Sequence, residues 1–378
     1  MLDRVRCWID GILEGYVGAR IRNTAAFVVA GIIESQSVVT AKIGRALPGE
    51  ALDKHKIKRV DRLIGNDRFD ATAISHALLD AFKFRPGQEI FLALDWTKIG
   101  SYQVMTTSVA TGGRAIPFQW TVIDDNKKRM ARAEREHIQK LKMMLPQGVD
   151  FTLLFDAGYD SSSYLELLNE LNLPYIVRVS SQVCVKPEGD VVANADEGGW
   201  FHLGKQSWKR STVYDWGWVS FSKEHGVRVR FVAIHDDRQK DPWLLVTNRN
   251  CAPRKIIHAY GRRFETEETY KDYKDVRNGL QLKGKRIKTP ERLARLIALE
   301  TLAYWLTSLT GLQGEEMGLH RQFQANTIRD RRVIALWRVG REILRRSLIR
   351  GHHLLERLHS LLDSLSRAIE GDLCRSSG

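Results

Sequence analysis

The sequence predicts a mixed α/β protein in which a sheet-rich middle part lies between two helical ends. Three observations support this prediction. Both ends of the chain, residues 1–85 and 281–378, carry apolar residues at helical spacing. Residues 89–124 contain three short runs rich in β-branched and aromatic residues, which are typical of strands. From there to residue 180, apolar runs alternate with amphipathic stretches, as strands alternate with helices in α/β proteins.

The first 85 residues are expected to form a helical bundle. The stretch 24–35 (TAAFVVAGIIES) is apolar, and 70–82 (DATAISHALLDAF) starts with Asp70, a residue suited to helix capping. Between them, 51–66 (ALDKHKIKRVDRLIGN) mixes Lys and Arg with apolar residues at helical spacing. A basic helix of this kind suits contact with a DNA backbone, but a plain scaffold with a solvated basic face explains it equally well.

The middle part is expected to begin with a meander of three strands. The predicted elements, in order, are strands at 89–97, 102–111 and 117–124, a helix at 131–145, a strand at 151–159, a helix at 164–171 and a strand at 175–180. This β-β-β-α-β-α-β order is that of the ribonuclease H fold. His137 lies on a helix rich in Glu and Arg and is expected to be solvated.

A tryptophan-rich, strand-like segment interrupts this order. It covers about residues 181–252 and is predicted to be a β-rich insertion; its tryptophans are Trp200, Trp208, Trp216, Trp218 and Trp243. One long helix, begun by Pro253 and ended near Gly279, is expected to follow. The rest is basic around 280–300 and then helical, with a last helix at 352–369.

The charge of the chain narrows the choice of partners. It has 59 Lys and Arg against 45 Asp and Glu, a formal net charge of +14 that can hold a polyanion. Nucleic acid is therefore the first partner to expect, ahead of an anionic membrane surface. No run of about 20 apolar residues predicts a membrane span, and no signal peptide is recognised, so a cytoplasmic protein is expected. The four cysteines are scattered, which makes a zinc site improbable.

Three acidic residues form a candidate site. Asp95 is predicted to end the first strand and Asp156 the fourth, and these strands are neighbours in the ribonuclease H fold. Either aspartate alone is more simply explained as a turn or a helix cap. Glu267 lies on the helix after the insertion. Converging carboxylates repel unless a cation lies between them, and oxygen-only donors favour Mg²⁺ or Mn²⁺. Two such ions can activate water or a 3′-hydroxyl at a phosphodiester.

Residues 258–274 (HAYGRRFETEETYKDYK) place Tyr260, Arg263, Glu267 and Lys274 along one side of a helix. At about 100° per residue, a continuous helix puts them on a stripe about 60° wide. The Arg and Glu alone are equally well explained as a solvated ion pair four residues apart. Together with the two strand aspartates, the stripe favours a functional site, because Arg and Lys suit phosphate groups.

The four residues of this stripe, with the spacing Y-(2)-R-(3)-E-(6)-K, resemble the signature of DDE transposases of the insertion-sequence-four family. Asp95 and Asp156 match the two aspartates of that family, and the long gap before Glu267 resembles its β-rich insertion. The resemblance covers roughly residues 88–280 and extends more loosely to the helical ends.

The resemblance implies a transposase of an insertion sequence that cuts transposon ends and joins them to target DNA by transesterification, with two Mg²⁺ or Mn²⁺ ions. Asp95, Asp156 and Glu267 would be the catalytic residues and metal ligands. Tyr260, Arg263 and Lys274 would bind phosphates near the cleaved end. Double-stranded DNA, both terminal inverted repeats and target, is the expected partner, and a homodimer is expected in the synaptic complex.

On this interpretation residues 1–85 form a DNA-binding domain, residues 86–280 a ribonuclease H-like catalytic core, and residues 281–378 a region for DNA contact and dimerisation. In this family the insertion can offer an aromatic ring to a flipped base, but packing within a sheet explains most of the five tryptophans better. Two other functions fit the pattern: a catalytically silent DNA-binding relative that represses transposition, and a structure-selective nuclease of the same fold. A transposase is expected with the bacterial nucleoid in the cytoplasm.

Overall fold

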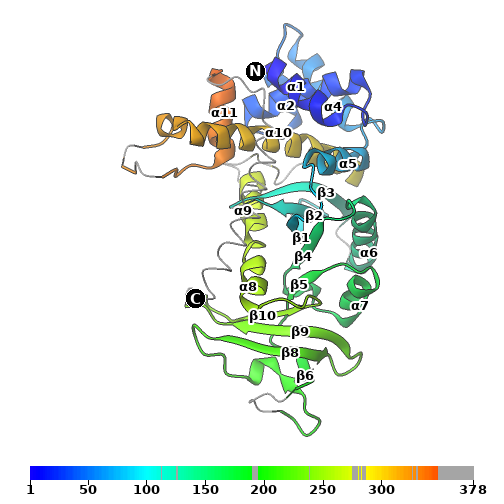
Figure 1. Ribbon diagram of the computed structural model, residues 1–378. Helices are drawn as coiled ribbons and strands as arrows, with labels where there is room; N and C mark the ends of the chain where they lie inside the picture. The colour runs from blue at the N-terminus through cyan, green and yellow to red at the C-terminus, as the bar shows by residue number, and fades with distance from the viewer. Residues whose placement is uncertain are drawn as a thin grey trace.

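The computed structural model describes residues 1–347, except 112, 125–126, 190–194, 238, 275–279, 281, 283–286, 326 and 329–330, and gives only the backbone of 127–129. The helix predicted at 352–369, the basic residues at 283–286 and Cys374 therefore lie outside the described residues. Figure 1 shows most of the helices gathered at one end of the molecule, with the sheet extending away from them.

The helices of the described chain are α1 (Leu2–Leu13), α2 (Ala19–Ser35), α3 (Thr40–Ala46), α4 (Asp53–Ile64), α5 (Ala71–Ala81), α6 (Lys127–Met144), α7 (Ser162–Glu170), α8 (Pro253–Gly261), α9 (Phe264–Lys274), α10 (Pro290–Glu316) and α11 (Leu336–Arg346). The strands are β1 (Glu89–Ile99), β2 (Tyr102–Ala110), β3 (Ala115–Asp124), β4 (Asp150–Phe155), β5 (Tyr175–Arg178), β6 (Cys184–Pro187), β7 (Phe201–His202), β8 (Val213–Phe221), β9 (Val227–Ile234) and β10 (Trp243–Thr247).

The described strands form one sheet in the order β3-β2-β1-β4-β5-β10-β9-β8-β6-β7. The first three pair antiparallel as the predicted meander, and β1, β4 and β5 pair parallel. The predicted fold class is confirmed: an α/β, ribonuclease H-like core with helical regions before and after it. The strands of the predicted insertion, β6 to β10, do not form a separate sheet, because β10 pairs antiparallel with β5 and continues the core sheet.

The two faces of the sheet are covered by different helices (Figure 1). Leu92, Leu153 and Val177 belong to the larger core cluster, which also contains the buried residues of α6 and α7. Their sequence neighbours Phe91 and Leu154 instead join a second cluster with Ile256 and Tyr260 of α8. Side chains alternate between the two faces of a strand, so Phe91 and Leu154 point away from α6 and α7 and toward α8.

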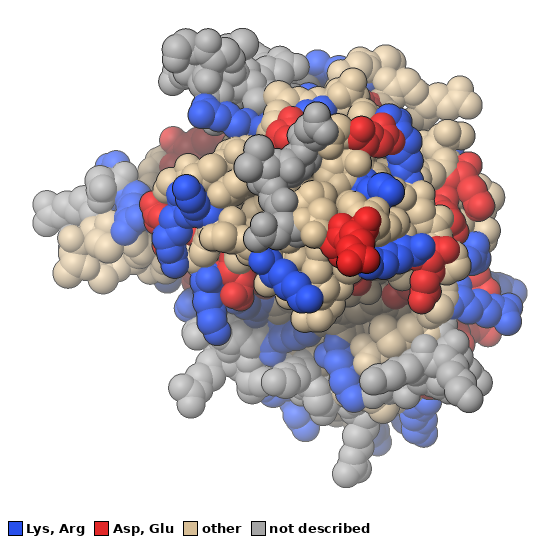
Figure 2. Space-filling view, turned by 90° about the horizontal axis from the view of Figure 1, so that it is seen from below, with Lys and Arg blue, Asp and Glu red and all other residues tan. Residues whose placement is uncertain are grey.

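Two tryptophans of the insertion, Trp208 before β8 and Trp216 within it, pack on other aromatic rings. Trp208 and Trp216 lie 5.4 Å apart, ring centre to ring centre, and both contact Phe231. Figure 2 views the molecule from the insertion end and shows acidic side chains interspersed among the basic ones. Two ion pairs of the insertion are Arg228 with Glu188 at 2.6 Å and Lys223 with Asp196 at 2.5 Å.

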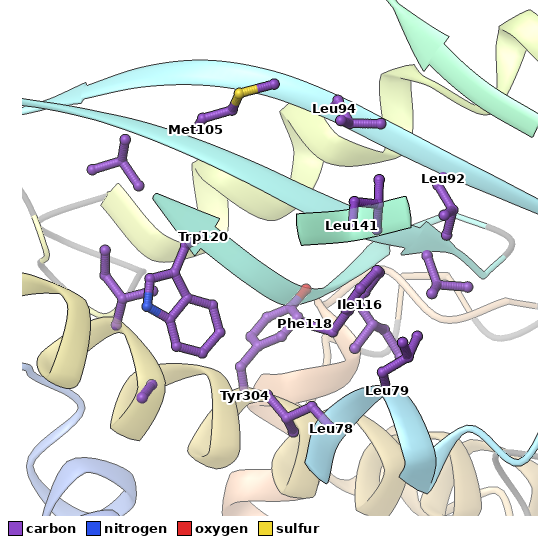
Figure 3. Packing of buried hydrophobic residues seen from close by; sticks show 14 of the residues in the cluster. Leu78, Leu79, Leu92, Leu94, Met105, Ile116, Phe118, Trp120, Leu141 and Tyr304 are labelled. Atoms are coloured by element: carbon purple, nitrogen blue, oxygen red, sulfur yellow. The ribbon is translucent and has the colours of Figure 1, made fainter. Parts of the chain in front are cut away.

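Helix α10 joins the N-terminal helices to the sheet. The indole Nε1 of Trp8 in α1 donates to the carbonyl of Leu302 at 3.2 Å, and Nε1 of Trp305 donates to the carbonyl of Pro117 in β3 at 3.0 Å. Figure 3 shows Phe118 of β3 beside Tyr304 of α10. One hydrophobic cluster therefore runs from α1 through α10 into the sheet.

Helices α10 and α11 cross with their backbones in contact at two glycines. A Cβ atom on Gly311 would lie 1.9 Å from the carbonyl oxygen of Leu336, and a Cβ atom on Gly340 would lie 1.8 Å from that of Thr307. Real Cβ atoms do not approach other atoms this closely, so both positions require glycine.

The prediction that His137 is solvated is wrong. The residue lies on the side of α6 that faces the sheet and is completely buried. Its Nε2 lies 2.7 Å from the hydroxyl of Thr107 and its Nδ1 lies 2.8 Å from that of Thr121. The two hydroxyls satisfy both ring nitrogens of a neutral imidazole, and burial lowers its pKa to about 3.

Several other expectations concern the N-terminal part and the thiols. Asp70 caps α5 as predicted, since its carboxylate accepts from the backbone N–H groups of Thr72 and Ala73. Within the described ranges no single helix is long and apolar enough to cross a membrane; α2 and α3 together reach that length and composition but are bent by 98°. Cys7, Cys184 and Cys251 are free thiols.

Candidate active site

Asp95 lies inside β1, not at its end, which corrects the predicted strand boundary. The parallel pairing of β1 with β4 stops at Ala93 and Leu154, but the antiparallel pairing with β2 continues to Ile99. Two residues beyond that last pair, the same register places Asp95 opposite Asp156. The two aspartates therefore meet where β4 ends and β1 continues, at the edge where α/β sheets bind ligands.

Alternation along β1 decides which helices Asp95 faces. Its neighbour Trp96 points to the α6 side of the sheet, where Nε1 donates to Oε1 of Glu134 at 2.6 Å. Asp95 must therefore point to the opposite side, toward α8 and α9. Asp156 follows β4 and caps a short 3₁₀ turn, its Oδ1 accepting from the N–H of Gly158 at 2.9 Å. The cap explanation therefore holds for Asp156, and its place opposite Asp95 is also the one expected for the site.

The single helix predicted from Pro253 to about Gly279 is in fact two helices, and this corrects the continuous stripe. Helix α8 ends at Gly261 and α9 begins at Phe264; residues 275–279 lie outside the described residues. Across the break, backbone hydrogen bonds run from residue i+3 to residue i, as in a 3₁₀ turn. Helix α8 packs over β5, β8 and β9, and α9 packs over β2 and β3, so the break lies where the helices pass from one part of the sheet to the other (Figure 1).

Tyr260 lies on the α8 side of the break, and the guanidinium of Arg263 lies 5.8 Å from the centre of its ring. Tyr260 is completely buried, and its ring packs edge-on against Trp243 at 4.9 Å and near Phe264 at 6.2 Å. Its hydroxyl is buried and has no hydrogen-bond partner among the described residues. Here Tyr260 is part of the packing beneath the site and does not reach solvent.

Arg263 and Glu267 form an ion pair, with Nη2 donating to Oε1 at 2.6 Å. The guanidinium is buried and lies over the ring of Phe264 at 4.5 Å, whereas the Glu267 side chain is 45% exposed. The pairing at four-residue spacing is the one expected from the sequence, but it is not a solvated surface pair. Its cation is fixed in an aromatic surrounding.

Polar contacts, more than apolar packing, fix α9 to the sheet. On one side, Oε2 of Glu265 accepts from the N–H of Thr111 at 2.7 Å, and the hydroxyl of Thr269 bonds both backbone groups of Ala115 in β3. On the other side, the ammonium of Lys274 hydrogen-bonds the hydroxyl of Thr97 in β1. The helix that carries Glu267 is thus held against β1, β3 and the turn between β2 and β3.

Tyr270 is the residue of this helix that the sequence analysis missed. Its hydroxyl donates to the backbone carbonyl of Asp95 at 3.3 Å and hydrogen-bonds the hydroxyl of Thr106. The available signal was helical spacing: Tyr270 lies three residues after Glu267 and four before Lys274, so it lies on their side of α9.

The carboxylates of Asp156 and Glu267 act electrostatically on Asp95. Burial, together with the nearby carboxylates of Asp156 and Glu267, raises the pKa of Asp95 to about 7, and the guanidinium of Arg263 opposes this shift. A buried carboxyl group beside two other acids is the condition in which a bound cation stabilises the ionised form.

The three carboxylates are of a chemical type that suits a divalent cation, but their arrangement in this structure is not yet that of a metal site. Three carboxylates with no sulfur or nitrogen donor suit Mg²⁺ or Mn²⁺. Within the described residues, however, no group of three His, Cys, Asp or Glu side chains is close enough to hold one ion. Glu267 is directed to Arg263 instead, so it would have to leave this partner to join the two aspartates.

Residues 122–306 match the family model of the transposase DDE domain. This match supports a DDE transposase. The matched range contains five of the six candidate site residues, Asp156, Tyr260, Arg263, Glu267 and Lys274, whereas Asp95 precedes it. A search among curated proteins found no match to the chain. A transposase domain implies a DNA substrate, and domains of this family generally use divalent metal ions.

Proposed function

We propose that the protein is a transposase of the insertion-sequence-four type that cuts the ends of its element and joins them to target DNA. The observation that carries the proposal is the meeting of Asp95 in β1 and Asp156 at the end of the parallel strand β4, on the sheet face covered by α9, which begins directly after Arg263 and carries Glu267. Two half-buried aspartates beside a fixed cation suit a site for a phosphodiester and a metal ion.

In this proposal Asp95, Asp156 and Glu267 hold two Mg²⁺ or Mn²⁺ ions. When bound, the ions polarise the scissile phosphodiester and activate water or a 3′-hydroxyl. Asp95 and Asp156 are already neighbours in register, and Glu267 approaches them once its pairing with Arg263 is released.

Arg263, Lys274 and Tyr260 form the proposed phosphate-binding part of the site. A phosphate that binds the guanidinium of Arg263 competes with Glu267 for the same donors. DNA binding would thereby free the third carboxylate. Because the hydroxyl of Tyr260 is buried, its contact with a phosphate requires a shift of α8.

The same proposal assigns the parts of the chain. Residues 1–85 bind DNA, residues 86–280 with the insertion at about 181–252 form the catalytic core, and residues 281–378 contribute DNA contacts and dimerisation. The bound form is a homodimer that holds two transposon ends, and the protein acts in the bacterial cytoplasm, with the nucleoid.

Helix α4 is the element of the N-terminal part best suited to DNA. Its exposed face carries five basic side chains, Lys54, His55, Lys58, Arg59 and Arg62. At helical spacing these fall within about 140° of one another, with no acid between them. Such a face suits phosphate contact at a groove of the duplex.

The test is cleavage of a plasmid that carries the gene's own flanking DNA, with purified protein and Mg²⁺ or Mn²⁺. We expect metal-dependent cuts at the element ends, followed by strand transfer. Asp95→Asn and Glu267→Gln should reduce cleavage by at least about 100-fold, the scale set by loss of one preorganised catalytic group. Glu268→Gln is the matched control, because its side chain is 43% exposed, like that of Glu267, but pairs with Lys271.

Each outcome separates the candidate functions. Cutting and joining at inverted repeats supports a transposase, and cutting without joining or without repeats supports a nuclease of the same fold. Tight binding to the ends without any cut supports a catalytically silent relative. Full cleavage by Glu267→Gln would remove Glu267 from the site.

A further inference from the structure

We infer that Tyr270 is a positioning residue, which holds α9 against β1 at Asp95 and so sets the distance between the Glu267 and Asp95 carboxylates. The inference rests on the proposed function, because it gives Tyr270 a role toward the metal-binding carboxylates of that site. Nothing in the signature spacing includes this residue.

The first support is the place at which the Tyr270 hydroxyl meets the sheet. Asp95 and Thr106 are direct partners in the register of β1 with β2. The hydroxyl contacts both of them: the backbone carbonyl of Asp95 at 3.3 Å and the hydroxyl of Thr106. A phenol has one hydrogen to donate and lone pairs that accept, so donation to Asp95 and acceptance from Thr106 use both functions at one register position.

The second support is the position of Tyr270 along α9. It lies one helical turn from Glu267 and one turn from Lys274, which itself hydrogen-bonds Thr97, two residues beyond Asp95 in β1. The ammonium of Lys274 lies 5.1 Å from the centre of the Tyr270 ring. Because a helix is rigid over one turn, fixing the phenol relative to Asp95 also fixes the backbone of Glu267.

The third support is that other contacts also hold α9 in place, so the positioning role of Tyr270 can be tested without releasing the helix. Glu265 and Thr269 attach α9 to the turn between β2 and β3 and to β3 itself, without Tyr270. Loss of one hydroxyl therefore leaves the helix attached, but it removes the contact nearest the acids. A displacement of about 1 Å at a catalytic group can reduce a rate on the order of 100-fold.

Tyr273 supplies a matched control on the same helix. It is buried, and its hydroxyl donates to Thr301 of α10 at 3.3 Å, away from Asp95. Tyr270→Phe and Tyr273→Phe therefore each remove one phenol hydroxyl and one α9 contact, but only the first contact reaches β1.

The experiment compares wild type, Tyr270→Phe and Tyr273→Phe by three measurements: Mn²⁺ titration followed by electron paramagnetic resonance, DNA affinity, and single-turnover cleavage of an end fragment. For Tyr270→Phe we expect weaker Mn²⁺ binding by severalfold and a cleavage rate lowered roughly 10- to 100-fold, with unchanged DNA affinity. Tyr273→Phe should match wild type in all three. As a second variant, Thr106→Val should show the Tyr270→Phe effects in weaker form.

If wild type is active and the two variants Tyr270→Phe and Tyr273→Phe bind Mn²⁺ and cleave DNA equally well, the inference is overturned and the proposed function stays intact. Equal loss in both variants also overturns it, because the effect would then be general loosening of α9. Wild-type protein that neither binds Mn²⁺ nor cleaves DNA overturns the proposed function, and the inference with it.

Discussion

At the scale of single residues, Arg263 shows how one side chain connects packing to the site. Its guanidinium lies over Phe264, which is itself stacked on Trp243 at 5.5 Å, and its outer nitrogen donates to Glu267. The aromatic rings fix the cation, and the cation fixes the carboxylate. A ligand that takes the guanidinium therefore changes the position of Glu267 without any change in the sheet.

His137 makes the folded protein sensitive to acid. Burial, with Lys140 nearby, lowers the pKa of its imidazole to about 3, against about 6.5 in an unfolded chain. Between these values the unfolded chain binds a proton that the folded chain does not, so this contribution to stability is complete above about pH 6.5 and is lost toward pH 3. We expect His137→Gln to remove a slope of up to about 1.4 kcal/mol per pH unit from the free energy of unfolding.

Urea unfolding at a series of pH values measures this slope. The control is His55→Gln, because His55 is exposed on α4 and should leave the slope as it is in wild type. Identical slopes in wild type and His137→Gln would contradict the explanation by burial.

Glu300 has the opposite dependence on pH. The residue lies in α10, is completely buried, and neither carboxyl oxygen has a hydrogen-bond partner among the described residues. Burial raises the pKa of Glu300 well above its usual value, so the folded chain keeps a proton that the unfolded chain loses above about pH 4.3. The contribution of Glu300 to the free energy of unfolding is therefore complete below about pH 4.3 and is lost as the pH rises toward the raised pKa of the folded state.

We expect Glu300→Gln to be more stable than wild type at pH 8, because an amide has no ionised form to exclude from the core. The difference should shrink as the pH falls toward about 4.3, at no more than about 1.4 kcal/mol per unit. Thermal unfolding at pH 8 and pH 5 measures it. A variant less stable than wild type at pH 8 would show that the carboxylate has a partner in the folded protein.

At the scale of elements, the crossing of α10 and α11 depends on backbone contact. Gly340→Ala places a methyl group where the carbonyl of Thr307 lies, so the helices must separate. We expect a loss of about 3 kcal/mol or more in the free energy of unfolding, at the upper end for overpacked positions. Chemical denaturation measures this, and Gly18→Ala is the control, since a Cβ atom there meets nothing within 4 Å. Similar losses in both variants would argue against the crossing as the cause.

A comparison of single elements also shows which parts of the fold could be predicted from the sequence. The core strands and helices were predictable, because each combines a clear periodicity with turn residues at its ends. The end of β1 was not, because β1 continues beyond Asp95 only through its pairing with β2, a contact between strands. The helix break after Gly261 was not predictable either, since it depends on where α8 and α9 meet different parts of the sheet.

The candidate site shows the same division. The ends of predicted strands indicated Asp95 and Asp156, and helical spacing indicated the ion pair of Arg263 with Glu267. The burial of Tyr260 and the contact of Tyr270 with Asp95 depend on tertiary packing, which no local pattern records. Helical spacing says which residues share a side, but not which side meets a strand.

At the scale of the whole molecule, the ends of the chain share a core with its middle. Helix α10, from the C-terminal region, packs on α1, α2, α4, α5 and β3. We therefore expect a fragment of residues 86–280 to fail to fold cooperatively, because it exposes Phe118, Trp120 and the rest of the α10-facing surface of β3. Circular dichroism and dye binding during thermal unfolding measure this, with residues 1–347 as the control. A sharp unfolding transition in the shorter fragment would show that the core is independent.

The attachment of the insertion to β5 also has a consequence for solubility. Without β6 to β10, β5 would be the outer strand on its side, with a row of unpaired backbone groups open to other chains. Unprotected outer strands of this kind are templates for intermolecular pairing. In the sheet of the described residues the outer strand on this side is β7 instead, which is only two residues long. Deleting the insertion would therefore leave an aggregation-prone protein, whatever else the segment does for catalysis.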